Sequence, residues 1–221
     1  MNPVNPLPLR FMVEGVGEVS ALLLLRPSSR ACFVFAHGAG AGMDHNFMAQ
    51  VAAALWDHDV ATLRYQFPYM EKGRRRPDVP AVAQAARCCP GLPLIAGGKS
   101  FGGRMTSQAQ AIAPLPGVRG LAFLGFPLHP AGKPSDARAA HLADIQVPLL
   151  FIQGNRDKLA ELPLLEMVVK RLGARAALHL VPEADHSFHV PARSGRNDRD
   201  VIVEVAKVLS GWNLTRGPGP A

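Results

Sequence analysis

Cysteine is scarce in this sequence, with three residues among 221, two of them adjacent at Cys88 and Cys89. Three cysteines do not form the disulfide framework of a small secreted domain. Residues 1–9 also lack the basic stretch and long apolar run of a secretory signal peptide. The sequence therefore predicts a cytoplasmic protein.

Long apolar runs are missing as well. The longest aliphatic run, residues 21–25, is far shorter than the ~20 residues that span a bilayer. The close pair His186 and His189 with Asp185 has no companion ligand motif, and a phosphate-binding loop would need glycine where Pro93 stands. We predict no membrane segment, no metal and no cofactor.

Acidic residues are fewer than basic ones, 17 against 24, which gives a net charge of +7. The dense basic run at residues 74–76 is short and has no interleaved aromatic residues. Clustered Lys and Arg bind phosphate, and interleaved aromatic residues stack on the bases of single strands. We interpret this run as a solvated loop, with contact to an anionic substrate or partner as the alternative, and expect no nucleic-acid partner.

The chain has the length and the composition of one soluble domain. Hydrophobic residues make up 48% and charged residues 19% of the sequence, and no internal repeat is present. The last residues are rich in Gly and Pro. We predict a single domain over residues 1–214 and a disordered tail over residues 215–221.

Short apolar runs recur along the chain and indicate a β-sheet. Residues 10–14 and 19–25, joined by a Gly-containing turn at 15–17, have the pattern of an antiparallel hairpin at a sheet edge. The later runs are apolar on both faces, as buried parallel strands are. We predict these strands at residues 31–36, 60–65, 93–96, 118–126, 148–153 and 177–181.

Apolar residues at helical spacing lie between and after these runs. The stripe from Phe47 to Trp56 predicts an amphipathic helix with Asp44 as its N-cap. The stripe from Val201 to Trp212 predicts a closing helix. Alternating strands and helices behind a hairpin predict the α/β class, with a mostly parallel mixed sheet and helices on both faces.

Residues 97–103 read GGKSFGG and contain the pattern G-x-S-x-G between a predicted strand and a predicted helix. In a nucleophile elbow the serine occupies a strained turn, and the glycines two before and two after it let neighbouring backbone pass. Gly98 and Gly102 meet this demand around Ser100. We predict that Ser100 is a nucleophile in an α/β-hydrolase fold; the alternative is a Gly-rich turn with an incidental serine.

A nucleophilic serine needs a base and an acid, and in α/β hydrolases these follow it in the order Ser, acid, His. His186 follows the last predicted strand and precedes the closing helix, with His189 as the second choice. Asp157 ends the apolar run before it, where its carboxylate can orient the imidazole. We predict Ser100, His186 and Asp157 as a catalytic triad.

Acyl transfer also needs donors for the developing oxyanion. The expected donors are the amide of Phe101, directly after the nucleophile, and an amide of the Gly-rich loop at residues 37–42. Within that loop we choose Ala39, with Gly40 as the alternative. We interpret His37 as a residue that shapes this loop.

Apolar and basic residues flank these motifs and suggest a substrate pocket. The segment after residue 126 carries Pro127, Pro130 and Pro134 and leaves no room for a large helical lid, so we expect an open site. The predicted pocket residues are Met43, Phe126, Leu128 and Phe188, and the flanking basic residues are Lys99, Arg104, Lys133 and Arg156. This set favours a short acyl ester with an anionic group.

Five strings carry a resemblance to a known family: HGAGAGMDHNFM (37–48), GGKSFGGRM (97–105), GFPLHPAGKP (125–134), QGNRD (153–157) and DHSF (185–188). They resemble the α/β-hydrolase-like family of the testis-expressed protein thirty and the NSL-complex hydrolase-like subunit, whose bacterial branch is dienelactone-hydrolase-like. The resemblance covers about residues 30–212. It implies the same nucleophile, acid and base as above, with serine where dienelactone hydrolases have cysteine.

These observations support two hypotheses of function. The first is a carboxylesterase-like serine hydrolase that cleaves a small-molecule ester through an acyl-enzyme, as a monomer or homodimer. The second is a non-catalytic hydrolase-like binding module. The two differ in geometry, because only the enzyme requires Ser100, His186 and Asp157 within hydrogen-bonding reach.

Overall fold

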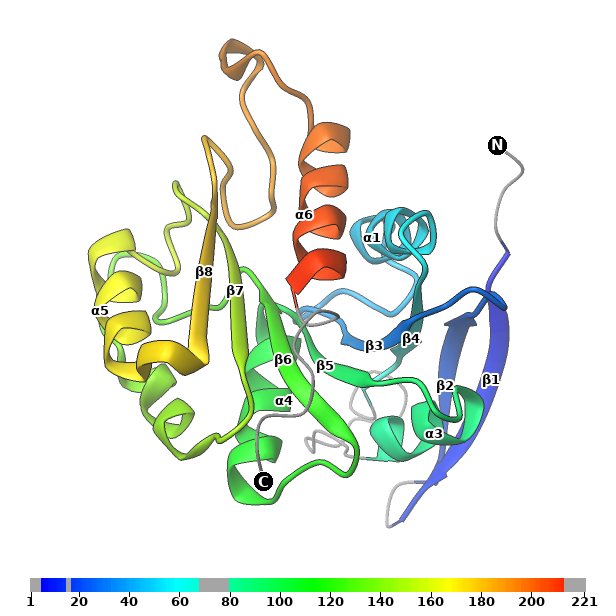
Figure 1. The fold of residues 1–221 in the computed structure, drawn as a ribbon. Helices are drawn as coiled ribbons and strands as arrows, with labels where there is room; N and C mark the ends of the chain where they lie inside the picture. The colour runs from blue at the N-terminus through cyan, green and yellow to red at the C-terminus, as the bar shows by residue number, and fades with distance from the viewer. Residues whose placement is uncertain (1–4, 15–16, 68–79, 213–221) are drawn as a thin grey trace.

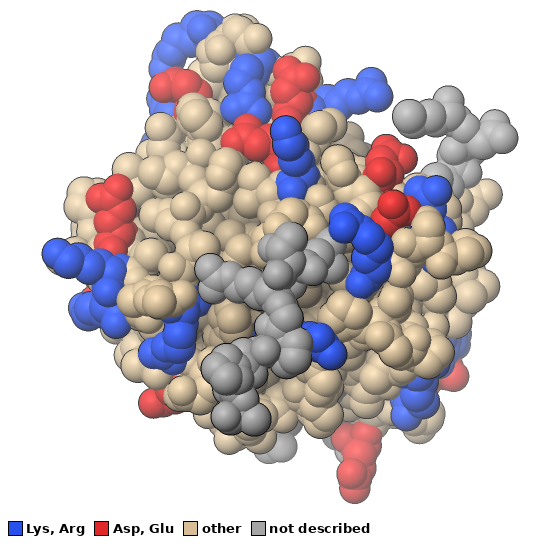
Figure 2. Space-filling model, viewed as in Figure 1, with Lys and Arg blue, Asp and Glu red and all other residues tan. Residues whose placement is uncertain are grey.

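The structure is a computed structural model that describes residues 5–14, 17–67 and 80–212. The basic run at residues 74–76 and the expected disordered tail at residues 215–221 lie outside these ranges. In Figure 2, Lys and Arg side chains are spread over the visible face of the molecule, several of them beside Asp and Glu. None of the described helices is both long and apolar enough to traverse a membrane.

The described residues form one eight-stranded sheet in the order β1-β2-β4-β3-β5-β6-β7-β8 (Figure 1). The pairs β1–β2 and β2–β4 are antiparallel, and all later neighbours are parallel. The mostly parallel mixed sheet with an N-terminal hairpin is therefore confirmed. The strands are β1 (Leu7–Val13), β2 (Gly17–Leu24), β3 (Ala31–Ala36), β4 (Val60–Tyr65), β5 (Leu94–Lys99), β6 (Val118–Leu124), β7 (Leu149–Gly154) and β8 (Ala176–Val181).

The central strands of the sheet are apolar on both sides, so both faces must be covered from water. Helices cover both of them. One apolar core lies under α1 (Asn46–Trp56) and α6 (Asp198–Trp212), which pack against each other. The other lies under α3 (Pro80–Cys88), α4 (Phe101–Ile112) and α5 (Leu162–Leu172). The two predicted amphipathic helices are thus α1 and α6.

Two local predictions need correction. The N-cap of α1 is His45, not Asp44, because the Nδ1 atom of His45 accepts a hydrogen bond from the Phe47 amide at 3.3 Å. The strand β5 extends to Lys99 instead of ending at residue 96, because Gly97 and Gly98 continue its pairing with β6. Between β6 and β7 the chain forms only the short 3₁₀ helix η1 (Ala137–Asp144), so no large lid is present there.

The topology brings the predicted motifs to one edge of the sheet. Parallel strands β3, β5, β7 and β8 end at the same edge, and the loops that follow them contain His37, Ser100, Asp157 and His186. The order of the strands in the sheet reverses at β3: β4 lies on one side of it, and β5 and the later strands lie on the other. Crevices at such switch points are where open α/β sheets bind ligands.

Candidate active site

Ser100 occupies a sharp turn between β5 and α4. Its φ is 50° and its ψ −117°, a backbone conformation that non-glycine residues rarely adopt, and α4 begins at the next residue, Phe101. The Ser100 amide donates to the Leu124 carbonyl at 3.0 Å, which fixes the turn against β6. The geometry is that of a nucleophile elbow.

The two motif glycines lie against the loop that follows β3. A Cβ atom at Gly98 would stand 2.3 Å from the carbonyl oxygen of Ala36, and one at Gly102 would stand 2.5 Å from that of His37. Both are backbone atoms of a buried strand and its loop, which cannot move without opening the sheet. Glycine at both positions is therefore a packing requirement.

Replacing Gly98 by alanine should destabilise the fold by about 3 kcal/mol, because the added methyl group forces β3 and β5 apart. Urea unfolding followed by circular dichroism measures the change. The control is Gly211→Ala in α6, where nothing lies within 4 Å of the added carbon and no loss is expected. Equal stability of the two variants would contradict the packing argument.

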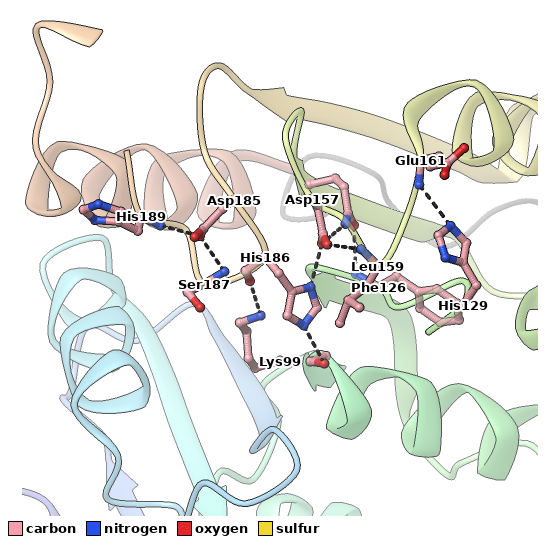
Figure 3. A network of polar contacts seen from close by, with 12 residues as sticks. Lys99, Phe126, His129, Asp157, Leu159, Glu161, Asp185, His186, Ser187 and His189 are labelled. Atoms are coloured by element: carbon pink, nitrogen blue, oxygen red, sulfur yellow. Dashed lines mark hydrogen bonds and ion pairs between the residues drawn. The ribbon is translucent and has the colours of Figure 1, made fainter. Parts of the chain in front are cut away.

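His186 lies in the loop after β8 and reaches Ser100 across the edge of the sheet. Its Nε2 atom lies 2.8 Å from Ser100 Oγ, and its Nδ1 atom lies 2.6 Å from Oδ2 of Asp157 (Figure 3). His189 does not reach the serine in this way; its Nδ1 lies 3.0 Å from Asp198, which raises the pKa of His189. The structure thus brings the first-choice histidine, not the second, to Ser100.

Asp157 has a fully buried side chain that receives three hydrogen bonds. Its Oδ1 accepts from the Leu159 amide at 2.7 Å, and its Oδ2 accepts from Gln153 Nε2 at 2.5 Å as well as from His186. Because the carboxylate is an acceptor only, Nδ1 of His186 carries the proton in this bond. In the neutral imidazole, Nε2 is then the acceptor that faces the Ser100 hydroxyl.

Gln153 is a contributor to the site that the sequence reasoning missed. It is buried on β7, and its Oε1 accepts from the Phe126 amide at 2.8 Å while its Nε2 donates to Asp157. The amide group therefore links the ends of β6 and β7 and orients the acid. The available signal was a single polar residue in an otherwise apolar strand, Leu149–Gly154.

The loop after β3 lies beside the elbow. A Cβ atom at Gly38 would stand 3.9 Å from that of Ser100. His37 is buried; its Nε2 accepts from the Phe67 amide at 3.1 Å, so Nδ1 is the donor to the Gly38 carbonyl at 2.8 Å. Burial lowers the pKa of His37, which favours this neutral form and a structural role.

The predicted oxyanion donors lie on two sides of Ser100. Phe101 is the first residue of α4, at the positive end of the helix dipole, and Ala39 lies on the wall of the cleft that contains Ser100. Gly40 is not part of that wall. Ala39 thus lies in the cleft with Ser100, and its role as the second donor stays a prediction.

A cleft of about 390 Å³ opens at Ser100. The four predicted pocket residues are not part of its wall: Phe126, Leu128 and Phe188 are buried in the two cores, and Met43 lies outside the wall. The wall comprises Gly38, Ala39, Ala41, His45, Phe47, Met48, Lys99, Ser100, Leu159, His186 and Ser187.

The four flanking basic residues do not gather around this cleft. Lys99 is part of the wall, whereas Arg156 pairs with Glu183 at 3.3 Å, and Arg104 lies over the ring of Phe101. Lys133 is exposed in the segment after β6. One cation of the four therefore lines the cleft.

Comparison with solved structures shows the same fold over nearly the whole chain. An esterase domain from Rhodothermus marinus superposes with a TM-score of 0.73 at 17% identity, covering 95% of this chain and 98% of the other. A dienelactone hydrolase from Anabaena variabilis gives 0.71 at 20%, covering 95% and 98%. A serine hydrolase without lid from Xanthomonas campestris gives 0.70 at 20%, covering 99% of each chain.

A family model described as "Alpha/beta hydrolase domain" matches residues 29–213. These residues contain the strands from β3 to β8, the elbow at Ser100 and the loops with Asp157 and His186. The sheet order and the solved structures agree with that match. The chain is therefore a member of the α/β hydrolase family.

Proposed function

We propose that this protein is a carboxylesterase-like serine hydrolase that cleaves a small ester through an acyl-enzyme. The observation that carries the proposal is the continuous line of short contacts from buried Asp157 through His186 to Ser100 in the cleft. Both distances are within hydrogen-bonding reach, as the enzyme hypothesis requires and the binding-module hypothesis does not. The resemblance to the dienelactone-hydrolase-like branch supports the same reaction class.

In the acylation step, Ser100 Oγ attacks the ester carbonyl carbon while its proton passes to Nε2 of His186. The carbonyl electron pair moves onto oxygen, where the amides of Phe101 and Ala39 stabilise it. The oxyanion then collapses, the bond to the alcohol oxygen breaks, and His186 returns the proton to that oxygen. Asp157 stabilises the imidazolium between these two transfers.

In the deacylation step, a water molecule replaces the alcohol. His186 takes a proton from the water as its oxygen attacks the acyl carbon, and a second oxyanion forms at the same two amides. Collapse breaks the bond to Ser100 Oγ, which recovers its proton from His186. The products are a carboxylic acid and the free enzyme.

The direct test is labelling with a fluorophosphonate probe, which reacts with an activated serine. We expect wild-type protein to be labelled and Ser100→Ala to be unlabelled, and peptide mapping should place the adduct on Ser100. Ser107, which is buried in α4, is the matched control: Ser107→Ala should be labelled like the wild type. Wild-type labelling no greater than that of Ser100→Ala would favour the binding module.

The cleft also limits the length of the acyl chain that it can hold. Its apolar wall is short, with Phe47, Met48 and Leu159 around Ser100, and no large lid extends it between β6 and β7. We expect kcat/KM for p-nitrophenyl esters to fall from acetate and butyrate to palmitate by about 10-fold or more. A rise toward the long chains would contradict the short-acyl proposal.

A further inference from the structure

Lys99 immediately precedes Ser100 and connects the elbow to the loop of His186. Its Nζ donates to the backbone carbonyl of His186 at 2.6 Å (Figure 3). The ammonium also lies 5.4 Å from the ring centroid of Phe188 and 5.8 Å from that of Phe47. These two rings stack on each other, one from the His186 loop and one from α1.

The His186 loop has a strained backbone. Glu183 and Phe188, on either side of the histidine, have positive φ values of 59° and 65°. Within the loop, Asp185 accepts from the amides of Ser187 and His189. These bonds shape the turn but do not set its distance from Ser100.

The loop is fixed on two sides by different elements. On the β7 side, the Arg156 amide donates to the Ala184 carbonyl at 2.9 Å, and Gly154 allows the two segments to approach closely. On the elbow side, Lys99 reaches the carbonyl of His186 itself. The contact therefore acts at the residue whose imidazole must align with both Ser100 and Asp157.

The charge of Lys99 has a cost in folding free energy. The Nζ atom contacts a carbonyl oxygen and aromatic faces, and burial lowers the pKa of Lys99 to about 8, against the opposing effect of the Asp157 and Asp185 carboxylates. Lys99 is half-buried, and none of the described carboxylates forms an ion pair with it, so the desolvation of its ammonium costs folding free energy. A methionine side chain would fill the same apolar space at no such cost.

We propose that Lys99 is a positioning residue for the reaction, which holds the His186 backbone so that the imidazole bridges Ser100 and Asp157. The inference rests on the proposed hydrolase function. It differs from an anion-binding role, in which the ammonium would contact a carboxylate of the substrate. A contact with His186 affects every ester, whereas an anion subsite affects only charged ones.

The kinetic test compares wild type, Lys99→Met and the surface control Lys170→Met in α5 on two substrates, p-nitrophenyl acetate and the mono-p-nitrophenyl ester of succinic acid. We expect Lys99→Met to lower kcat for both by about 10- to 100-fold with KM unchanged, because the base is misplaced. Lys170→Met should match wild type. A loss confined to the succinate ester and seen in KM would assign Lys99 to substrate binding and overturn the proposal, as would unchanged kcat.

Two measurements separate positioning from a general structural role and from failure of the proposed function. The urea unfolding midpoint of Lys99→Met at pH 7 should equal or exceed that of wild type; a lower midpoint, or a variant that does not fold, would make Lys99 structural and overturn the proposal. The low-field proton resonance of His186 Nδ1–H should shift or broaden in Lys99→Met. This signal does not depend on turnover, so an unchanged resonance would overturn the proposal even in a protein that hydrolyses no ester.

Discussion

Replacing His186 by alanine is expected to lower kcat for p-nitrophenyl acetate by about 10⁴- to 10⁶-fold. The reason is that Nε2 of His186, 2.8 Å from Ser100 Oγ, is the acceptor placed to take the hydroxyl proton. Without it, attack would require a neutral hydroxyl as nucleophile. Steady-state kinetics on the pure variant, with circular dichroism to verify folding, measures the change.

The matched control is His189→Ala, three residues further along the same loop. Its imidazole is exposed and bonded to Asp198, so hydrolysis should stay near the wild-type rate. The double variant of Ser100→Ala with His186→Ala should be no slower than either single variant, because the two groups act as one unit. If the fold-losses in kcat of the two single variants multiplied in the double variant, the assignment of the base would be contradicted. A loss in His189→Ala greater than that in His186→Ala would also contradict it.

Much of the fold could be predicted because hydrophobic periodicity reports burial directly. The strands at residues 31–36 and 60–65 agree with the prediction, since both are buried on both faces and are followed by a polar residue. The hairpin followed from two alternating runs around a glycine turn. Strand ends are harder to predict where glycines continue a strand, as in β5, because glycine signals a turn as readily as a close packing contact.

The grouping of Ser100, His186 and Asp157 could be anticipated because each of these residues follows a strand that the sequence predicts. Each lies in the segment that follows a parallel strand, and such strand ends meet at one edge of the sheet. The sequence alone carries no distances. The contacts of 2.8 Å and 2.6 Å therefore depended on the fold that brings residues 86 and 29 positions apart together.

The cleft wall could not be derived in the same way. Phe126 and Phe188 are near the motifs in sequence, yet both rings turn into the cores, where they bury more apolar surface. The wall instead uses Phe47 and Met48 from α1 and Leu159 from the loop after β7. Side-chain direction at the end of a strand depends on long-range packing, which sequence proximity does not encode.

The change Asp157→Asn should lower kcat/KM by about 10³- to 10⁴-fold with little change in overall fold. Asp157 meets three donors, His186 Nδ1 and Gln153 Nε2 at one oxygen and the Leu159 amide at the other. Asparagine has one oxygen and one NH₂ group, so no orientation accepts from all three. The charge that stabilises the imidazolium is lost in either orientation.

The two orientations of the substituted amide in Asp157→Asn differ in what they do to the base. With its oxygen toward His186, the NH₂ group opposes the Leu159 amide, which is backbone and cannot turn away. With its NH₂ group toward His186, the imidazole must place its proton on Nε2, and the lone pair no longer faces Ser100.

Asp185→Asn is the matched control for this change. One Asp185 oxygen accepts from both Ser187 and His189, and an asparagine oxygen can keep both bonds. We expect this variant to lose less than about 10-fold in kcat/KM. If Asp157→Asn lost no more than Asp185→Asn in the same ester assay, Asp157 would not be the acid of the triad, because only its substitution removes a carboxylate from His186.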